Sequence, residues 1–418
     1  MVKPGYKQTE IGELPETWRI VQLKDVSVGK FTYGVNAPAV EYMPPLPNYI
    51  RITDISDEGH FIRENRASVI CANPELFTLK ENDIVFARTG ASTGKTYLYR
   101  QEDGELVYAG FLIKASIDPL CADSRYIFAA LHTKEYWNWV ATASMRSGQP
   151  GINGNEYASY QIALPELSEQ TYIADALEET DNLISSLEKQ ITKKKAIKQG
   201  AMQELLTGKK RLPGFSGDWQ KFNLMKHSKI KARIGWQGLK KSEYLDSGYA
   251  LLVTGTDFAD GKVQWDSCHY VTLDRYDQDR NIQIQNNDIL ITKDGSLGKA
   301  ALVQGLSKPA TLNSGIFVIR PLQNAYDPVF VYHILSSFVF KDFLDKLSAG
   351  STIIHLYQKD VGKFEFLLPP TIEEQKAIAA VLSEMDADIA ALEEKLAKYR
   401  QIKQGMMQQL LTGKIRLV

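Results

Sequence analysis

The feature that most constrains this chain is a long internal repeat. Residues 170–212 read QTYIADALEETDNLISSLEKQITKKKAIKQGAMQELLTGKKRL, and residues 375–417 read QKAIAAVLSEMDADIAALEEKLAKYRQIKQGMMQQLLTGKIRL. The two segments align without a gap at one offset, since the two first residues and the two last residues are each 205 positions apart. A repeat of this length predicts a tandem pair of similar halves rather than one continuous domain.

The repeated segment has the apolar spacing of a coiled-coil helix. In the second copy, apolar residues follow alternating steps of four and three, which predicts a narrow seam. These residues are Ile378, Leu382, Met385, Ile389, Leu392, Leu396 and Tyr399, and their counterparts are Ile173, Leu177, Thr180, Ile184, Leu187, Ile191 and Lys194. Two counterparts are not apolar, so we expect a weaker seam in the first copy. A helix of about 40 residues would be about 60 Å long.

Signals for helix ends flank both copies. Thr371 and Glu374 have the spacing of a capping box, whereas the first helix begins near Ser168 without one. Gly208 and Gly413, each followed by lysine, predict the C-terminal ends. Because one such helix cannot bury its seam alone, we expect the two to pack on each other as an antiparallel pair, with a large domain at each end.

Two glycines lie inside the predicted helices at equivalent places, Gly200 and Gly405. An interior glycine costs about 1 kcal/mol relative to alanine. Either another backbone approaches closely there, from the sister helix or from a partner protein, or one tolerated glycine was duplicated with the repeat.

The repeat continues more weakly into the rest of each half. Residues 82–95 (NDIVFARTGASTGK) correspond to 286–299 (NNDILITKDGSLGK), and residues 159–165 correspond to 363–369. Each half consists of short β-rich runs separated by Gly, Pro, Asn and Asp turns. A helical stretch lies late in each half, at 124–140 and at 328–347. The sequence between these anchors diverges, which suggests two recognition modules of different specificity on one scaffold.

Composition narrows the class of protein. The net charge of −1 provides no general attraction to nucleic acid, so DNA binding would need basic residues gathered on one face. Cys71, Cys121 and Cys268 are odd in number and far apart, which indicates neither a disulfide framework nor a zinc site. We see no signal peptide and no run long enough to span a bilayer, so we expect a cytoplasmic protein.

One segment imitates a phosphate-binding loop. GASTGKT at 90–96 is one residue short of that loop's spacing, and its counterpart GSLGKA at 295–300 is shorter still and lacks the Ser/Thr for magnesium. A glycine-rich connection between strands explains both better than a nucleotide site, although Lys95 and Lys299 could still contact a DNA phosphate. The histidines lack metal-binding spacing, the neighbours Cys268 and His269 suggest a structural pair, and there is no nucleophile elbow. Because the halves share no constellation of catalytic type, we expect a binding protein with no catalytic or metal-ligating residues.

Together these segments resemble the specificity (S) subunit of type I restriction-modification systems. The most specific parts are the LP-x(3–4)-EQ segments at 164–170 and 368–375, the long helices, and the LLTGK ends. The opening segment 6–18, YKQTEIGELPETW, adds to the resemblance, which extends over nearly the whole chain.

The resemblance implies a fold and four segments. The expected class is α+β, with two mixed α/β target recognition domains joined by two long antiparallel coiled-coil helices in an internal pseudo-two-fold repeat. The expected boundaries are 1–163 for the first recognition domain, 164–210 for the first spacer helix, 211–367 for the second domain and 368–418 for the second helix.

The resemblance also implies partners. Each recognition domain would bind one half of a split site on double-stranded DNA, with half-sites about one helical turn, roughly 34 Å, apart. The chain would hold two methyltransferase (M) subunits, and motor-nuclease (R) subunits would join them, with no membrane partner. This chain would carry no cofactor, because S-adenosylmethionine, ATP and magnesium would belong to the partners.

Base contacts need Arg, Lys, Asn or Gln at groove edges, and basic residues add phosphate contacts. The candidates in the first half are Arg51, Arg88, Lys95, Arg146, Ser147, Gln149 and Asn153. Those in the second half are Lys231, Arg233, Trp236, Gln237, Lys240, Lys293, Lys299 and Ser351. Arg88 and Lys293 occupy matched positions, whereas Arg51 aligns only approximately with Thr254. Any of them could instead be an ordinary solvated surface residue.

Two further alternatives stay open at this level. The lysine run 193–195 is either a solvated helix face or a contact with DNA or a methyltransferase subunit. The whole chain could also be a coiled-coil scaffold that joins proteins without DNA sequence reading.

Overall fold

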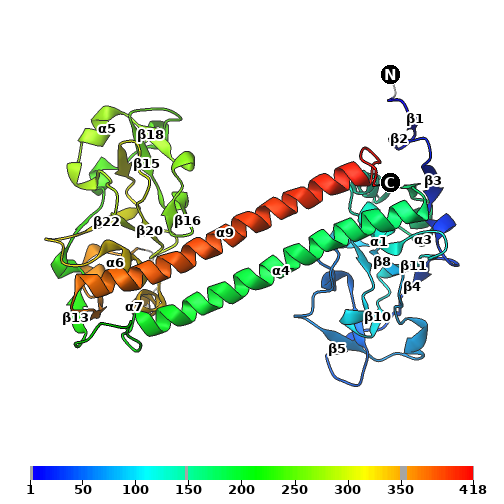
Figure 1. The fold of residues 1–418 in the computed structure, drawn as a ribbon, viewed down its shortest axis with the longest axis horizontal. Helices are drawn as coiled ribbons and strands as arrows, with labels where there is room; N and C mark the ends of the chain where they lie inside the picture. The colour runs from blue at the N-terminus through cyan, green and yellow to red at the C-terminus, as the bar shows by residue number, and fades with distance from the viewer. Residues whose placement is uncertain (1–2, 146–148, 349–354, 418) are drawn as a thin grey trace. The chain divides into compact units, whose positions relative to one another are not determined.

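The computed structural model describes residues 3–145, 149–348 and 355–417, which form two compact units. Unit 1 comprises residues 1–188 and 394–418, and unit 2 comprises residues 189–393. Each unit therefore contains one globular half of the chain together with parts of both long helices (Figure 1).

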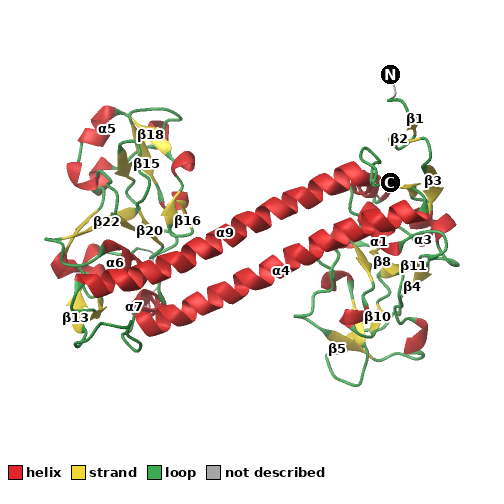
Figure 2. Ribbon diagram, in the orientation of Figure 1, coloured by secondary structure: helices red, strands yellow, loops and turns green. Residues whose placement is uncertain are grey.

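Unit 1 is built on two four-stranded sheets (Figure 2). The first has the order β4-β11-β8-β9 and is antiparallel, and the second has the order β10-β6-β7-β5, with β10 and β6 parallel. Two further pairs, β1-β2 and β3-β12, are antiparallel. The strands are β1 Tyr6–Thr9, β2 Gly12–Pro15, β3 Arg19–Gln22, β4 Thr32–Tyr33, β5 Ala39–Glu41, β6 Asn48–Ile50, β7 Ala67–Val69, β8 Asp83–Ala87, β9 Thr96–Leu98, β10 Leu106–Tyr108, β11 Leu112–Ser116 and β12 Gln161–Leu164, and the short helices are α1 Ser124–Ala130, α2 Lys134–Ala143 and α3 Gly154–Ala158.

Unit 2 has a six-stranded sheet of order β14-β22-β19-β20-β17-β16 and a three-stranded sheet of order β18-β15-β21. The strands are β13 Gln220–Asn223, β14 Ser228–Lys231, β15 Ala250–Val253, β16 Phe258–Ala259, β17 Lys262–Val263, β18 His269–Val271, β19 Ile289–Thr292, β20 Ala300–Leu302, β21 Ala310–Leu312, β22 Ile316–Pro321 and β23 Glu365–Leu368, and the short helices are α5 Leu273–Asp277, α6 Pro328–Leu335, α7 Phe338–Ser348 and α8 Gln358–Val361.

The two units repeat one topology. The order β4-β11-β8-β9 recurs as β14-β22-β19-β20, and the parallel pair β6-β10 recurs as β15-β21. Central strand β8 is buried on both faces, since Ile84 and Phe86 enter one core cluster and Val85 and Ala87 another. Strand β19 divides its residues in the same way. The predicted tandem scaffold of mixed α/β halves is therefore confirmed.

The late helical stretches differ in detail from the prediction. Each is two helices rather than one, α1 and α2 in unit 1 and α6 and α7 in unit 2. In unit 1 the break has a local cause, because the Thr133 hydroxyl caps α2 by accepting from the Tyr136 amide at 3.3 Å.

The two long helices are α4, Leu167–Leu205, and α9, Ile372–Leu410, of 39 residues each. Both end three residues before the glycines that predicted their ends. Gly208 and Gly413 have φ of 71° and 67°, the left-handed region in which a residue after a helix is usually glycine. Thr371 accepts from the Glu374 amide at 3.3 Å, but the Glu374 carboxylate bonds to Arg211. The predicted capping box is thus only half formed.

Helices α4 and α9 pack antiparallel through matched ion pairs. In unit 1, Asp181 pairs with Lys403 at 2.6 Å and Glu188 with Arg400 at 2.7 Å. Adding the repeat offset of 205 residues to the acids and subtracting it from the bases gives the pairs Asp386–Lys198 and Glu393–Lys195, and both occur in unit 2. The same pair of α4–α9 ion pairs therefore occurs once in each unit.

The interruptions of the α4 seam have partners on α9. The Thr180 hydroxyl lies 3.5 Å from the Met406 sulfur, and Lys194 Nζ lies 2.7 Å from Asp388 Oδ2. Because Lys195 also bonds to α9, two members of the lysine run hold the helix pair together, a role that neither alternative considered for this run anticipated.

The LP-x(3–4)-EQ segments and the ends of the helices form a second duplicated contact. In unit 1 the buried carboxylate of Glu169 accepts from Arg416 and from the Trp18 indole, the latter at 3.1 Å. In unit 2 the buried carboxylate of Glu374 accepts from Arg211, at 2.7 Å to Nη2. The following glutamines, Gln170 and Gln375, each accept from a backbone amide just before α1 or α6. We call each Glu–Arg pair an end clamp, since it joins the start of one long helix to the end of the other.

Breaking an end clamp should be costly. Arg416→Ala would leave the Glu169 carboxylate buried without its cation, and we expect a loss of about 3–5 kcal/mol in the free energy of unfolding, measured by urea denaturation. The control is Arg400→Ala, which removes an exposed ion pair of the same helix and should cost no more than about 1 kcal/mol. Equal losses in the two variants would show that burial of the clamp is unimportant.

Candidate nucleic-acid interface

Three loops of unit 1 meet beside one end of the β4-β11-β8-β9 sheet. They are the end of strand β4 at Tyr33 with the loop after it, the connection between β8 and β9, and the loop that precedes α3. The Gly90 amide donates to the Pro150 carbonyl at 3.1 Å, Thr89 forms a β-bridge with Gly151, and the Gly154 amide donates to the Tyr33 hydroxyl at 3.0 Å. These bonds hold the divergent loops of the sequence on one surface.

Three predicted DNA contacts lie together on this surface. The Arg88 guanidinium lies 5.0 Å from the centre of the Tyr33 ring, and its carbonyl accepts from the Ile152 amide. Gln149 is exposed, and its amide nitrogen lies 3.1 Å from where a Cβ at Gly90 would stand. Asn153 is exposed and caps α3, accepting from the Asn155 and Glu156 amides.

Two exposed aromatic residues of this surface were absent from the prediction. Tyr33 is 42% exposed and Phe111 is 57% exposed, and the Phe111 carbonyl accepts from the Arg88 amide. Each stands next to a glycine in the sequence, as does the predicted Trp236. An aromatic residue directly beside a glycine is therefore the sequence pattern that could have predicted these two exposed rings.

The structure gives Arg51 a structural role. Its Nε and Nη2 donate to Asp54 at 2.7 and 2.8 Å, and this hydrogen bonding raises the pKa of the guanidinium further. Thr254 occupies the matching turn and likewise donates to Asp257. Arg51 and Thr254 therefore share a place and a purpose, which is to hold the carboxylate of a turn.

Lys95 and Lys299 are also matched. Lys95 Nζ lies 2.7 Å from Asp57 and 3.5 Å from the Ile55 carbonyl, and Lys299 Nζ donates to the Phe258 carbonyl. The two carbonyls stand at the same place after the matched turns. Lys299 is exposed, so one lysine of the pair presents more of its length to solvent.

The corresponding surface of unit 2 is less positive around its central cation. Lys293 aligns with Arg88, and its carbonyl accepts from the Leu356 amide as that of Arg88 accepts from Ile152. Its ammonium lies 6.0 Å from the Phe317 ring centre but also 3.8 Å from Asp294, which His355 contacts at 2.5 Å. A carboxylate thus partly offsets the charge of Lys293.

The basic segment 229–241 divides into buried and exposed residues. Arg233 is only 2% exposed and donates to the Leu312 carbonyl at 2.8 Å and to the Thr311 hydroxyl at 3.2 Å. Gln237 is 6% exposed, and its Oε1 has no hydrogen-bond partner in the described part of the chain. Lys231 and Lys240 are exposed, and Trp236 is 77% exposed. Arg233 and Gln237 therefore support the loop, and the other three face solvent.

Three predicted contacts, Arg146, Ser147 and Ser351, lie outside the described residues.

The segment that imitates a phosphate-binding loop is a connection between strands, as predicted. It forms a short 3-10 turn over Gly90–Ser92 and then enters β9, not a helix. The amides of Gly90, Thr93, Gly94 and Lys95 donate to Pro150, Gly90, Ala87 and Ser92. A phosphate cradle requires such amides to be free, so this loop does not provide one.

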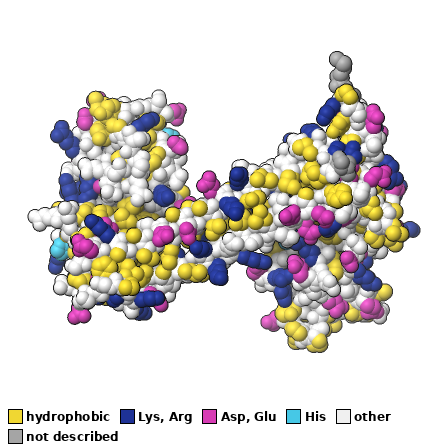
Figure 3. Space-filling view, in the orientation of Figure 1, with side chains coloured by type: hydrophobic (Ala, Val, Ile, Leu, Met, Phe, Trp, Pro, Cys, Tyr) yellow, Lys and Arg dark blue, Asp and Glu magenta, His cyan; other side chains and the backbone are white. Residues whose placement is uncertain are grey.

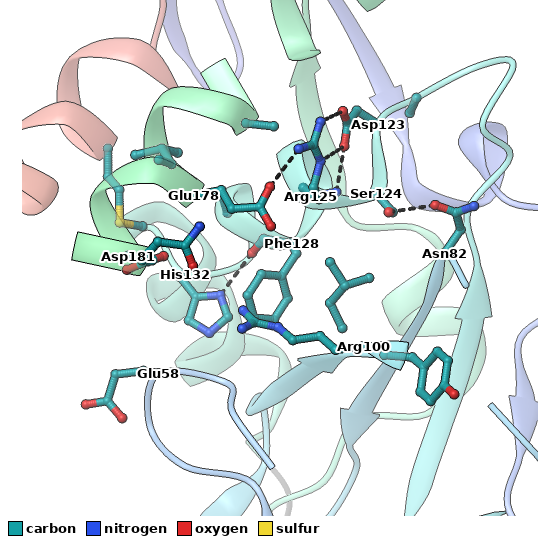
Figure 4. A pocket seen from close by; sticks show the side chains of 18 of the residues that line it. Glu58, Asn82, Arg100, Asp123, Ser124, Arg125, Phe128, His132, Glu178 and Asp181 are labelled. Atoms are coloured by element: carbon teal, nitrogen blue, oxygen red, sulfur yellow. Dashed lines mark hydrogen bonds and ion pairs between the residues drawn. The ribbon is translucent and has the colours of Figure 1, made fainter. Parts of the chain in front are cut away.

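Unit 1 also contains a pocket of about 1250 Å³ lined partly by α1, α4 and the end of α9 (Figure 4). Several of its charged side chains are held in ion pairs. Arg125 donates to Asp123, Asp175 and Glu178 at 2.7 Å each, and Asp181 pairs with Lys403. Burial lowers the pKa of His132 to about 4, so this ring is uncharged at neutral pH. These groups stabilise helix packing, and we assign the pocket no chemistry.

Charge is mixed over the molecule as a whole. Lys and Arg alternate with Asp and Glu over the face shown in Figure 3, in keeping with the net charge of −1. Because the charge is mixed, any attraction to nucleic acid must come from local groups such as segment 229–241.

Within the described ranges, no helix has the length and apolarity needed to cross a membrane.

The fold and its paired loop surfaces define a class: a tandem recognition protein whose two scaffolds share an antiparallel helix pair. The family model described as "Type I restriction modification DNA specificity domain" matches residues 15–199 and 218–404. The chain belongs to this family.

Known relatives extend over almost its full length. The chain is 26% identical over 431 residues to the type I restriction enzyme MjaVIII specificity subunit of Methanocaldococcus jannaschii, covering 99% of this chain and 96% of the relative. Its fold is similar to that of a type I restriction-modification S subunit from M. genitalium, with a TM-score of 0.63, 15% identity and coverage of 94% and 96%. It is also similar to a chain from a type I R-M system structure, with a TM-score of 0.57, 17% identity and coverage of 96% and 99%.

Family membership decides between the functional alternatives. The chain is the DNA-specificity subunit of a type I restriction-modification system, is itself non-catalytic and carries no cofactor, since S-adenosylmethionine and ATP sit on the modification and restriction subunits. This excludes a scaffold that does not read DNA.

The burial of Arg233 gives a direct test of its structural role. Arg233→Ala would leave the Leu312 carbonyl and the Thr311 hydroxyl without their donor inside unit 2, and we expect a loss of about 2–4 kcal/mol in the free energy of unfolding. Lys231→Ala, at an exposed position of the same segment, should change it by less than about 0.5 kcal/mol. Urea denaturation of both variants measures this change. If Arg233→Ala leaves the free energy of unfolding unchanged, the structural role is wrong and Arg233 is again a candidate DNA contact.

Proposed function

We propose that each unit of this specificity subunit reads one half of a split DNA sequence through the loops beside its sheet. The observation that carries this proposal is the matched position of two unlike loop surfaces on two copies of one scaffold. Identical surfaces would suit a symmetric site, whereas these differ in charge and in aromatic residues. Two different half-sites follow.

The proposed segments are those expected from the sequence: recognition domains at 1–163 and 211–367, and spacer helices at 164–210 and 368–418. The proposed contacts in the first domain are Arg88, Gln149 and Asn153, with Lys95 on the phosphate backbone and the exposed rings of Tyr33 and Phe111 beside them. In the second domain they are Lys231, Trp236, Lys240, Lys293 and Lys299. Arg51, Arg233 and Gln237 support the loops from within.

The proposed complex contains two methyltransferase subunits and, with them, motor-nuclease subunits, and it acts on double-stranded DNA in the cytoplasm. S-adenosylmethionine, ATP and magnesium serve those partners. The duplicated contacts support two equivalent docking places for methyltransferase subunits. A surface of the helix pair that recurs 205 residues later in the chain can bind the same partner a second time.

Gly200 and Gly405 mark one such feature. A Cβ at either position would meet nothing within 4 Å, so neither glycine makes room for the sister helix. Each stands three residues after an exposed isoleucine, Ile197 at 49% and Ile402 at 40%. Two helix glycines beside apolar residues, with no packing reason among the described residues, fit close approach by an identical partner at each place.

The recognition proposal is tested by methylome sequencing of cells that express the chain with its methyltransferase. We expect adenine methylation at one split sequence. Replacing residues 1–163 by the recognition domain of another subunit should change one half of that sequence and leave the other half and the gap unchanged. A change of both halves would contradict independent reading by the two domains.

The docking proposal predicts that one substitution raises the stability of the isolated chain but lowers its affinity for the methyltransferase. Gly200→Leu should raise the stability of the isolated chain by roughly 1 kcal/mol, because it removes a helix glycine from open space. The same change should weaken methyltransferase binding roughly 10- to 100-fold at one of the two docking places and leave the other unchanged, because an added side chain overpacks a close contact. Gln199→Leu, at the exposed neighbouring position, is the control and should leave binding unchanged. Calorimetric titration with the methyltransferase subunit checks both, and undiminished binding by both Gly200→Leu and Gly405→Leu would exclude close approach at these glycines.

A further inference from the structure

An exposed tryptophan, Trp236, stands in the middle of the basic segment 229–241. Trp236 is 77% exposed and Ile234 is 53% exposed, and they lie on either side of Gly235. Two neighbouring exposed apolar side chains rimmed by polar residues form a small patch of the kind that often marks an interaction site.

The charge of the segment indicates the chemistry of that partner. Residues 229–241 contain five basic residues, Lys229, Lys231, Arg233, Lys240 and Lys241, and no acidic residue. Apart from Arg233 all are exposed, and none of the four lysines forms an ion pair with any described residue. The nearest acid in sequence, Glu243, is bonded to Arg275 at 2.6 Å and also accepts from the Lys240 backbone amide at 2.8 Å. An apolar tip bordered by free ammonium groups complements a polyanion with apolar faces inside it, which is the composition of a DNA duplex.

The tip is held in place from both sides. Before it, Arg233 is anchored to the Leu312 carbonyl and to Thr311. After it, a 3-10 turn is closed by two backbone hydrogen bonds. The backbone N–H of buried Gln237 donates to the Ile234 carbonyl at 2.9 Å, and the backbone N–H of Gly238 donates to the Gly235 carbonyl at 3.1 Å. The backbone that carries the indole is therefore a turn fixed by hydrogen bonds, so less backbone freedom remains to be lost when Trp236 binds.

We propose that Trp236, with Ile234 beside it, inserts at a base step of the half-site that unit 2 reads and partly unstacks it. This inference rests on the proposed function and deepens it. Apolar side chains that enter a duplex separate neighbouring base pairs and kink the helix axis, and an aromatic ring recovers part of the lost stacking. Sequence is then selected partly by how easily the step opens, which favours pyrimidine–purine steps such as TA.

The matched segment of unit 1 differs, so the effect is confined to one half-site. Between β4 and β6 it exposes Tyr42 at 41% and Met43 at 56%, but residues 34–47 include no lysine or arginine, and Glu41 adjoins the ring. The Arg66 guanidinium already lies 5.7 Å from the centre of the Tyr42 ring. The same place in the two scaffolds therefore carries an insertion tip in unit 2 and an ordinary loop in unit 1.

The test uses the full complex with its methyltransferase and duplexes of the mapped site that carry 2-aminopurine at successive positions. Wild-type complex should raise the fluorescence at one step of the second half-site, as unstacking does. Trp236→Ala should abolish that rise and weaken binding roughly 10- to 100-fold, whereas Trp236→Phe should retain part of both. Leu120→Ala, at an 87% exposed leucine of unit 1, and Tyr42→Ala are controls that should leave both unchanged.

The other outcomes separate the alternatives. If wild-type complex binds no specific sequence, the proposed function itself fails. If it binds specifically but no probe in the second half-site brightens, or if Trp236→Ala binds as tightly as wild type, insertion is overturned while the function stands. If Trp236→Ala fails to assemble with the methyltransferase, the indole contacts protein, which also overturns insertion.

Discussion

The two end clamps are the contacts on which the architecture depends. A carboxylate buried as deeply as those of Glu169 and Glu374 is tolerated only with a cation and well-placed donors. In both units that cation comes from the far end of the other long helix, through Arg416 and Arg211. Neither globular half can therefore satisfy its own buried acid with a contiguous stretch of chain. Each core also takes apolar residues from the start of one helix and the end of the other, as Ile173 and Leu410 do in unit 1.

This sharing explains why the repeat is strong in some places and weak in others. A residue of a long helix packs against its own unit and also meets the sister helix, so a change in one copy disturbs contacts that the other copy supplies. The pairs Asp181–Lys403 and Asp386–Lys198 show the same contact preserved on both sides. The loops around Arg88 and Lys293 have no such obligation, because the described bonds that hold them come from their own globular half and not from the long helices. Assembly is thus assigned to the repeated parts, and recognition can diverge in the rest.

The sequence alone predicted those features that depend on periodicity and on the internal repeat. It predicted the duplicated α/β scaffold, the paired long helices and the strand connection at Gly90–Ser92, since each leaves a local pattern. It could not show that Arg233 is buried, because the Leu312 carbonyl that accepts from it lies 79 residues away. Nor could it show that the lysine run pairs with α9, since a lysine beside a distant acid looks the same as a solvated lysine. The exposed Tyr33 and Phe111 were missed for the converse reason, because exposure depends on what fails to pack over a ring.

The matched cations indicate how the two units divide affinity between their contacts. Arg88 stands over an aromatic ring, with a planar guanidinium suited to bidentate bonds with guanine or phosphate. Lys293 shares its surroundings with Asp294, which opposes the approach of a phosphate at that point. Under the proposed reading of DNA by both units, unit 2 would obtain more of its attraction elsewhere, and the exposed lysines of segment 229–241 supply a local excess of positive charge. On this argument unit 1 depends more on the loops around Arg88 and unit 2 more on the segment after β14, although both have the same topology.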